Sequence, residues 1–166
     1  MSRAFVKEGD GALDPLPDLP QSPHPNYVTP RGLASLRARL RQRQTDLATL
    51  KSRPVRLDKL PEAAAERDIR YLESRLRSAI LTHPTPNRHE AAFGHRITVS
   101  DPQGHTTTYE ITGEDEADAT LHRIAPHSPL ARALLGSQIG DDVLWRKPNG
   151  PVTLTIRGIS HADPQT

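Results

Sequence analysis

Two carboxylates near the middle of the chain are spaced so that they could bind a metal ion together. Asp58 and Glu62 are the only acidic residues of the segment PVRLDKLPEA, at 54–63. Mg²⁺ prefers carboxylate oxygens, so the pair could help to hold a weakly bound cation. The surrounding positive charges compete with a bound metal: Arg53, Arg56 and Lys59. A structural role is the stronger alternative, because Asp58 could cap a helix and Glu62 could interact with its N-terminal dipole.

The other reactive side chains show no catalytic or metal-binding pattern. The 166 residues include eight histidines and no cysteine, and the histidines do not follow metal-ligand spacing. The sequence shows no recognisable Ser-His-Asp catalytic triad. The N-terminus has no apolar signal region, and no segment approaches the length that spans a membrane. We therefore expect no metal site, no cofactor of its own, no membrane contact and no enzyme activity, in a monomeric cytoplasmic protein.

Positive charge is concentrated in the middle of the chain. Residues 29–82 carry 13 basic and 6 acidic side chains, while 1–28 and 83–166 are both net acidic. Such a segment suits a polyanion or an acidic protein surface. Arg37 and Arg41 are four residues apart and would share one helix face. We take these two, with Arg53 and Arg56 further along, as a candidate basic face that could contact RNA or DNA; a solvated helix face is the alternative.

The elements that must position these residues begin with a helical hairpin at 29–82. The arm before it, 1–28, has five prolines between 15 and 25 and few large apolar groups. It should be extended or disordered, with its end held on the first helix. Thr29-Pro30 is a helix start, and Pro54 should end that helix by about Ser52. Each helix has a one-sided apolar seam: Leu33, Leu36, Leu40, Leu47 and Leu50, then Ala65, Ile69, Leu72, Leu76 and Ala79. Two such seams joined by a short breaker predict an antiparallel coiled coil.

The rest of the chain predicts a small α+β domain at 93–160, reached through a linker at 83–92. β-Branched runs at 96–100, 106–111, 142–146 and 152–156 are separated by turn sequences. A short helix at 129–135 ends before Gly136, which is a typical C-terminal cap residue. We expect an antiparallel sheet of four or five strands with one short helix packed against it.

Four motifs of this domain resemble the bacterial Gre transcription elongation factors. They are YEITGEDEAD at 109–118, HSPLARALLG at 127–136, GDDV at 140–143 and KPNG at 147–150. Residues at the start of the hairpin also resemble the family's coiled coil: Thr29, Arg31, Gly32, Leu33 and Leu36. The resemblance implies an FKBP-like C-terminal domain that docks at the secondary channel of RNA polymerase, and a coiled coil that enters the channel. It also implies a docking surface around Ser128, Pro129, Ala131 and Arg132, with Asp115 and Glu116 nearby.

The hairpin tip departs from the family pattern. Cleavage-active members carry a Gly-Asp-x-x-Glu-Asn type of tip, whose acids help to hold a second Mg²⁺ of the polymerase. An alignment of the second helix places Asp58 near the family's glutamate, and Val55 at the partner aspartate. Both arms are also several residues shorter. Stimulation of RNA cleavage is therefore doubtful, and a shared Mg²⁺ of RNA polymerase is the only metal that the resemblance would bring to this chain.

The sequence leaves four functions to compare. The leading hypothesis is a factor that binds RNA polymerase at the secondary channel and regulates transcript elongation. The first alternative is a channel competitor without cleavage activity, which resembles the regulator of nucleoside diphosphate kinase and its short hairpin. A nucleic-acid-binding module would follow from the basic middle segment. Prolyl isomerase activity rests on fold analogy alone.

Overall fold

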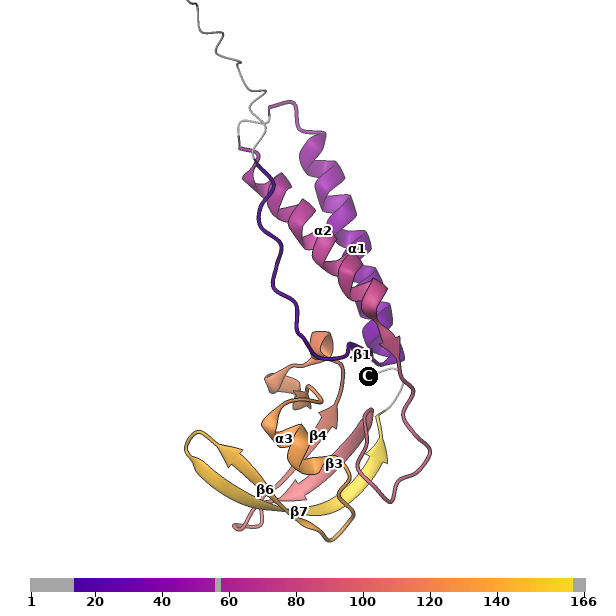
Figure 1. Cartoon of the computed structure of the whole chain (residues 1–166), viewed down its shortest axis with the longest axis vertical. Coiled ribbons are helices and arrows are strands. Elements are labelled where there is room, and N and C mark those ends of the chain that lie inside the picture. Colours follow the sequence, from indigo (N-terminus) through magenta and orange to yellow (C-terminus); the bar gives the residue numbers. More distant parts are fainter. Residues whose placement is uncertain (1–13, 56–57, 163–166) are drawn as a thin grey trace, which may run out of the picture.

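A helical hairpin projects from one end of a curled sheet domain (Figure 1). This computed structural model describes residues 14–55 and 58–162. Arg56 and the ends of the N-terminal arm and C-terminus lie outside the described residues. The predicted α+β class and the order of hairpin before sheet are confirmed.

The two helices of the hairpin are α1 (Pro30–Lys51) and α2 (Leu60–Ser78). Thr29 caps α1 by accepting a hydrogen bond from the backbone N–H of Gly32, and Ser52 is the C-cap, as predicted. The 22 residues of α1 span roughly 33 Å at 1.5 Å per residue. The seam packs at the base of the hairpin, where Leu36 and Leu72 are almost fully buried with Val28. One narrow apolar seam cannot by itself fix the direction of the hairpin.

The N-terminal arm is ordered where the structure describes it. Residues 14–26, which we call the strap, are extended and run along the hairpin beside α2 (Figure 1). The arm then forms β1 (Tyr27–Val28), which pairs in parallel with β2 (Ile80–Leu81) directly after α2. The expectation that the arm is extended therefore holds for 14–28, but disorder is wrong there. The sequence could not show this, because the contacts that hold the strap come from residues about 50 positions away.

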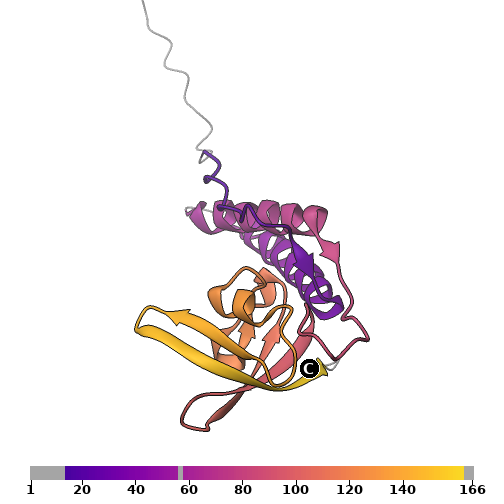
Figure 2. The same ribbon diagram turned by 60° about the horizontal axis from the view of Figure 1, so that its bottom comes forward.

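The sheet has five strands in the order β5-β4-β3-β7-β6. They are β3 (His95–Ser100), β4 (Thr106–Ile111), β5 (Arg123–Ile124), β6 (Asp142–Lys147) and β7 (Gly150–His161). All neighbours are antiparallel except β4 and β5, which are parallel, so the sheet is mixed rather than purely antiparallel. The two residues of β5 are too few to show a strand pattern. Figure 2 shows β6 and β7 as a long curved ribbon that extends away from the hairpin.

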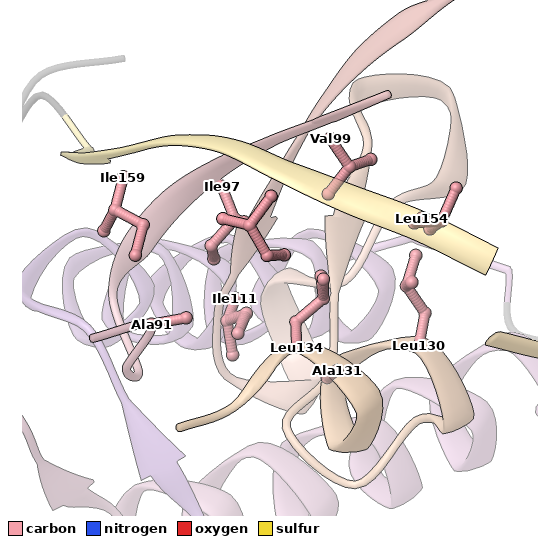
Figure 3. Close-up of a cluster of buried hydrophobic side chains, with 10 residues drawn as sticks. Ala91, Ile97, Val99, Ile111, Leu130, Ala131, Leu134, Leu154 and Ile159 are labelled. Atoms are coloured by element: carbon pink, nitrogen blue, oxygen red, sulfur yellow. The ribbon is translucent and has the colours of Figure 1, made fainter. Parts of the chain in front are cut away.

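One short α-helix, α3 (Pro129–Leu134), covers the concave face of the curled sheet. Leu130, Ala131 and Leu134 point from it toward the strands (Figure 3). They pack in a buried cluster with side chains from the sheet and the preceding loop: Ala91, Ile97, Val99, Ile111, Leu154, Ile156 and Ile159. Ala91 comes from the predicted linker at 83–92, so the end of that segment belongs to the domain core. Its N–H donates to the Ser137 carbonyl at 2.8 Å.

Two 3-10 helices that the sequence did not predict follow β4. They are η1 (Glu114–Glu116) and η2 (Ala119–Leu121). The first lies where the sheet domain meets the hairpin and contacts both α1 and β1. The first three acidic residues of the GEDEAD motif, Glu114 to Glu116, are thereby placed at the base of both helices.

Candidate functional site

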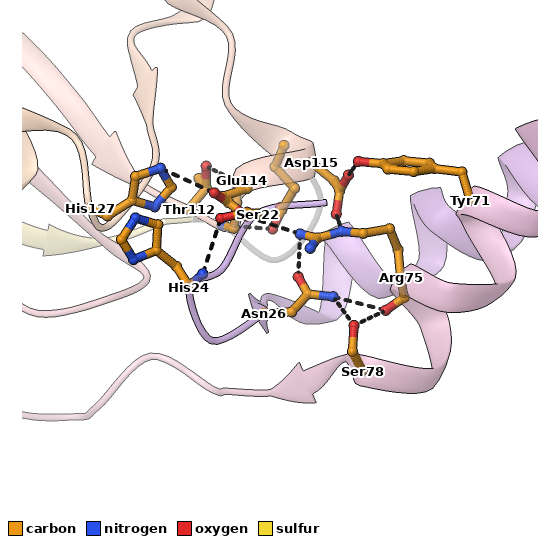
Figure 4. Close-up of polar contacts among 12 residues, drawn as sticks. Ser22, His24, Asn26, Tyr71, Arg75, Ser78, Thr112, Glu114, Asp115 and His127 are labelled. Carbon is orange, nitrogen blue, oxygen red and sulfur yellow. Dashed lines mark hydrogen bonds and ion pairs between the residues drawn. The ribbon is translucent and has the colours of Figure 1, made fainter. Parts of the chain in front are cut away.

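The joint between hairpin and sheet domain is built around Arg75 of α2. Its side chain is 3% exposed, and its Nε donates to Oδ2 of Asp115 at 2.7 Å. Its Nη2 donates to Oδ1 of Asn26 at 2.6 Å and to Oε2 of Glu114 at 3.2 Å (Figure 4). One guanidinium therefore holds the second helix, the strap and η1 together. Because its charge is compensated by two carboxylates, its burial is tolerated.

The amide of Asn26 and the phenol of Tyr71 extend this network. Nδ2 of Asn26 donates to the Arg75 carbonyl at 2.8 Å and to Oγ of Ser78 at 3.1 Å. The Tyr71 hydroxyl donates to Oδ1 of Asp115 at 3.3 Å. Burial raises the pKa of Tyr71 above 10.0, and the negative charge of Asp115 raises it further. Tyr71 thus remains a donor to the carboxylate that Arg75 also holds.

Glu116 makes the equivalent connection to the first helix. Its carboxylate accepts from Oγ1 of Thr29 at 2.5 Å and from the N–H groups of Thr29 and Gly113, at 3.3 and 3.2 Å. Nη2 of Arg31 lies 3.2 Å from Oε1 of Glu116 and 2.6 Å from Oε1 of Glu110. A carboxylate at a helix N-terminus also interacts favourably with the helix dipole. The sheet domain thus anchors α1 through Glu116 and α2 through Asp115.

These contacts correct the expectation that Asp115 and Glu116 belong to an exterior docking surface. Their side chains are 9% and 6% exposed, and their oxygens are engaged within the chain. A partner could reach them only by breaking the joint. Asp115 and Glu116 therefore have a structural function in the joint.

The helix α3 presents only part of the predicted docking stretch to solvent. Oγ of Ser128 caps α3 by accepting from the Ala131 N–H at 3.3 Å, while Pro129 and Arg132 are exposed. Ala131 is completely buried on the side of α3 that packs against the core, so it cannot contact a partner and its predicted place in the docking surface is wrong. Leu135 and Ile139, 38% and 58% exposed, extend the apolar part of the same surface.

The tip carboxylates do not form a metal site among the described residues. Oδ1 of Asp58 accepts a hydrogen bond from the Leu60 N–H at 2.9 Å, at the start of α2. Glu62 is 7% exposed and lies within the first turn of α2. Across 14–55 and 58–162, no cluster of three or more His, Asp or Glu side chains could hold a metal. The expectation that Asp58 caps α2 is wrong in one respect: Lys59 is the N-cap residue and makes no side-chain cap hydrogen bond, and Asp58 precedes it and accepts from the N–H of Leu60, the first residue of the helix.

The candidate basic face is exposed along α1. Arg37, Arg41 and Arg53 are all exposed, and Arg37 and Arg41 lie one helical turn apart. Arg56, the fourth predicted member, lies outside the described residues. Arg43 differs from this group because it pairs with Asp46 and Asp68, at 3.4 and 3.3 Å. Within the described part of the chain, no helix is apolar and long enough to cross a membrane.

Comparison with known proteins shows which family shares this arrangement. Residues 85–161 match the family model described as transcription elongation factor GreA/GreB, C-terminal. The transcription elongation factor GreA of Francisella philomiragia is 32% identical over 158 residues, which cover 81% of this chain and 95% of that relative. The chain belongs to the GreA/GreB family. The extent of that match includes the hairpin as well as the sheet domain.

Other members of the GreA/GreB family match over shorter stretches. GreA of Pseudomonas aeruginosa is 36% identical over 103 residues, which cover 60% of this chain and 65% of the relative. The chain therefore spans just under two thirds of the length of that relative. Among solved structures, GreA factor homolog 1 of Thermus thermophilus is 22% identical, with a TM-score of 0.41 over 82% of this chain and 99% of that chain.

Sequence reasoning missed the residues that hold the joint. Arg31, Arg75 and Asn26 were not among the predicted site residues, although charge complementarity was a usable signal. The hairpin is strongly basic, and the GEDE segment at 113–116 has three acids in a row. The acidic turn belongs to the sheet domain, and arginines lie near both ends of the hairpin. This distribution of charge is typical of ion pairs between two such parts of a protein.

Proposed function

We propose that this protein binds RNA polymerase at the secondary channel and regulates transcript elongation. The observation that carries the proposal is the doubly anchored joint, in which Asp115 holds α2 and Glu116 holds α1. A hairpin of roughly 33 Å is thereby held in one direction from the surface that α3 presents. Such a protein can dock through its sheet domain and direct the hairpin tip into a channel. The membership in a family of transcription elongation factors supports RNA polymerase as the partner.

The docking surface we propose is the exposed part of the α3 region: Ser128, Pro129, Arg132, Leu135 and Ile139. It combines apolar side chains with one cation, a composition that suits a protein interface. Arg37 and Arg41 have no ion pair with another described residue and could contact RNA or DNA in the elongation complex. Phosphate contacts of this kind would be sequence-independent and sensitive to salt.

Binding to core RNA polymerase tests this proposal. We expect wild-type protein to bind with a Kd of about 1 µM or lower, and Arg132→Ala to weaken binding about tenfold. Arg146→Ala is the matched control, because Arg146 is an exposed cation of β6 on the opposite face of the strand from Val143 and Trp145, which pack on the core beside α3. If wild-type protein does not bind the polymerase, or Arg132→Ala and Arg146→Ala bind equally well, the docking assignment is wrong.

The geometry of the tip favours a second candidate, a channel competitor that does not stimulate cleavage. Oδ1 of Asp58 accepts a hydrogen bond at the start of α2 and Glu62 is nearly buried, so the two carboxylates do not form a joint set of exposed oxygen ligands for a metal of the polymerase. In a backtracked elongation complex, we expect this protein alone to leave the RNA uncut and to inhibit cleavage stimulated by a GreA protein. RNA shortening that is lost in both Asp58→Asn and Glu62→Gln would instead support a cleavage factor.

A further inference from the structure

The strap occupies a built groove on the hairpin and ends at the predicted docking loop. The Arg70 guanidinium of α2 holds its first part, with Nε donating to Oδ1 of Asp18 and Nη2 donating to the Leu16 carbonyl, both at 2.7 Å. Leu16 and Leu19 are half-buried against the hairpin. One side chain of α2 thus recognises both a backbone group and a carboxylate of the same extended segment, which is typical of peptide binding.

The last part of the strap reaches the loop before α3. The imidazole of His24 stacks on that of His127, with ring centroids 4.3 Å apart and planes inclined by 14° (Figure 4). His127 directly precedes Ser128 and Pro129, and its Nε2 lies 3.1 Å from Oε1 of Glu114. The strap therefore touches both the α2 side of the hairpin and the edge of the α3 surface. The proposed function uses both the hairpin, which would enter the channel, and the α3 surface, which would dock.

The two halves of the strap are held with very different strength. Asn26 and Val28 are 5% and 2% exposed and are fixed by the Arg75 network and the β1–β2 pair. In contrast, the Arg70–Asp18 pair is 39% and 76% exposed, so salt should screen it. Grooves of about 450 and 380 Å³ remain open on the hairpin beside Leu19. The first half can therefore detach while Asn26 and β1 stay in place.

We propose that residues 14–25 of the strap inhibit binding to RNA polymerase and are released when the protein engages the polymerase. We call this segment the guard; it covers the α2 side of the hairpin and the edge of the α3 surface. The guard is acidic, with Asp14 and Asp18, and the groove beneath it is lined by Arg70, Arg77 and Glu73. Detachment frees the Arg70 guanidinium, which the guard otherwise engages, for contact with the partner. This inference rests on the proposed function.

The absence of cysteine makes a direct test possible in the full chain. The double variant Asp18→Cys/Arg70→Cys is joined with a short bismaleimide that contains a cleavable disulfide, and binding to core RNA polymerase is measured before and after reduction. We expect the locked protein to bind at least about tenfold more weakly than the reduced protein, and a variant lacking residues 1–22 to bind at least as tightly as wild type. Each single-cysteine variant treated with the same reagent controls for chemical modification.

The possible outcomes separate the guard from the function on which it rests. If the locked and reduced proteins bind with equal affinity, or the locked form binds more tightly, the guard hypothesis is wrong but the proposed function is unaffected. If no form binds, including the variant lacking residues 1–22, both the guard and the proposed function are wrong. A separate measurement follows the rate at which a thiol reagent labels Leu19→Cys, which should rise with salt if the strap detaches. A labelling rate that does not change with salt would contradict the release step.

Discussion

Nε of Arg75 lies 2.7 Å from Oδ2 of Asp115, and this buried ion pair joins the second helix of the hairpin directly to the sheet domain. The hairpin has one narrow apolar seam, which packs around Leu36 and Leu72 but does not fix its direction relative to the sheet domain. Its direction therefore depends on a small number of charged side chains.

Removal of the Arg75 guanidinium should destabilise the protein strongly. Arg75→Ala leaves Asp115, Glu114 and Asn26 without their shared donor in a buried position, and we expect a loss of about 3 kcal/mol in the free energy of unfolding. Arg77→Ala is the control two residues away on the exposed side of α2, with an expected change within about 0.5 kcal/mol. Urea unfolding of both variants measures the difference, and equal effects would contradict the assigned role of Arg75.

Gly32 should not tolerate alanine, although it lies in a helix. Glycine to alanine in a helix normally stabilises by about 1 kcal/mol. Here an added Cβ would lie 2.8 Å from Cγ of Glu116, whose carboxylate is fixed by Thr29 and Gly113. We expect Gly32→Ala to destabilise by about 1–3 kcal/mol in urea unfolding. In a Glu116→Ala background the same change should stabilise; a stabilising effect in the wild-type background would show that Glu116 moves freely.

Asp58 should stabilise the turn that leads into α2 and should not act as a metal ligand. Asp58→Ala removes the acceptor for the Leu60 N–H, and we expect a loss of about 1 kcal/mol in stability, as for an ordinary hydrogen bond. Asp58→Asn keeps a side-chain oxygen at the same place, so its stability should stay close to that of wild type. Thermal unfolding of the three proteins with and without Mg²⁺ checks this. Stabilisation by Mg²⁺ in wild type alone would point to metal binding instead.

Tyr71 should make the joint sensitive to alkaline pH. Burial, together with the Asp115 carboxylate, raises the pKa of Tyr71 above 10.0. A raised pKa means that the folded state binds the phenol proton more tightly than the unfolded state. This contribution to stability is complete below about pH 10 and is lost as pH rises through the folded-state pKa.

Urea unfolding between about pH 8 and pH 11 measures this effect. The stability of wild type should fall more steeply in this range than that of Tyr71→Phe, which itself loses about 1 kcal/mol at neutral pH with its hydrogen bond. Tyr27→Phe, at a residue that is 41% exposed, should keep the wild-type slope. Parallel slopes for wild type and Tyr71→Phe would contradict the role of Tyr71.

Local and periodic features could be predicted because each depends on neighbours in the chain. The Thr29 cap, the ends of α1 and the two seams follow from helix geometry. The hairpin turn between β6 and β7 follows from the KPNG segment at 147–150. The resemblance to Gre factors came from motifs in which spacing itself is informative, and the comparison with GreA of Francisella philomiragia confirmed it.

The site was less predictable, because exposure is a property of the assembled fold. Ala131 and Arg132 are adjacent in α3, yet Ala131 is fully buried against the core and Arg132 is exposed. The sequence alone could not distinguish Asp115 and Glu116 from acidic residues that are exposed to solvent. Only the approach of Arg75 and Thr29, 40 and 87 residues away, made them internal partners.

The sequence by itself therefore determined the helices, most strands, the family and the unusual composition of the tip. The tertiary structure decided which charges are buried, where the strap lies and how the hairpin is joined to the sheet domain. The physical reason is that helices and turns are stabilised mainly by residues a few positions apart. Buried ion pairs instead require several distant groups to lose water together, and that condition exists only once the chain has folded.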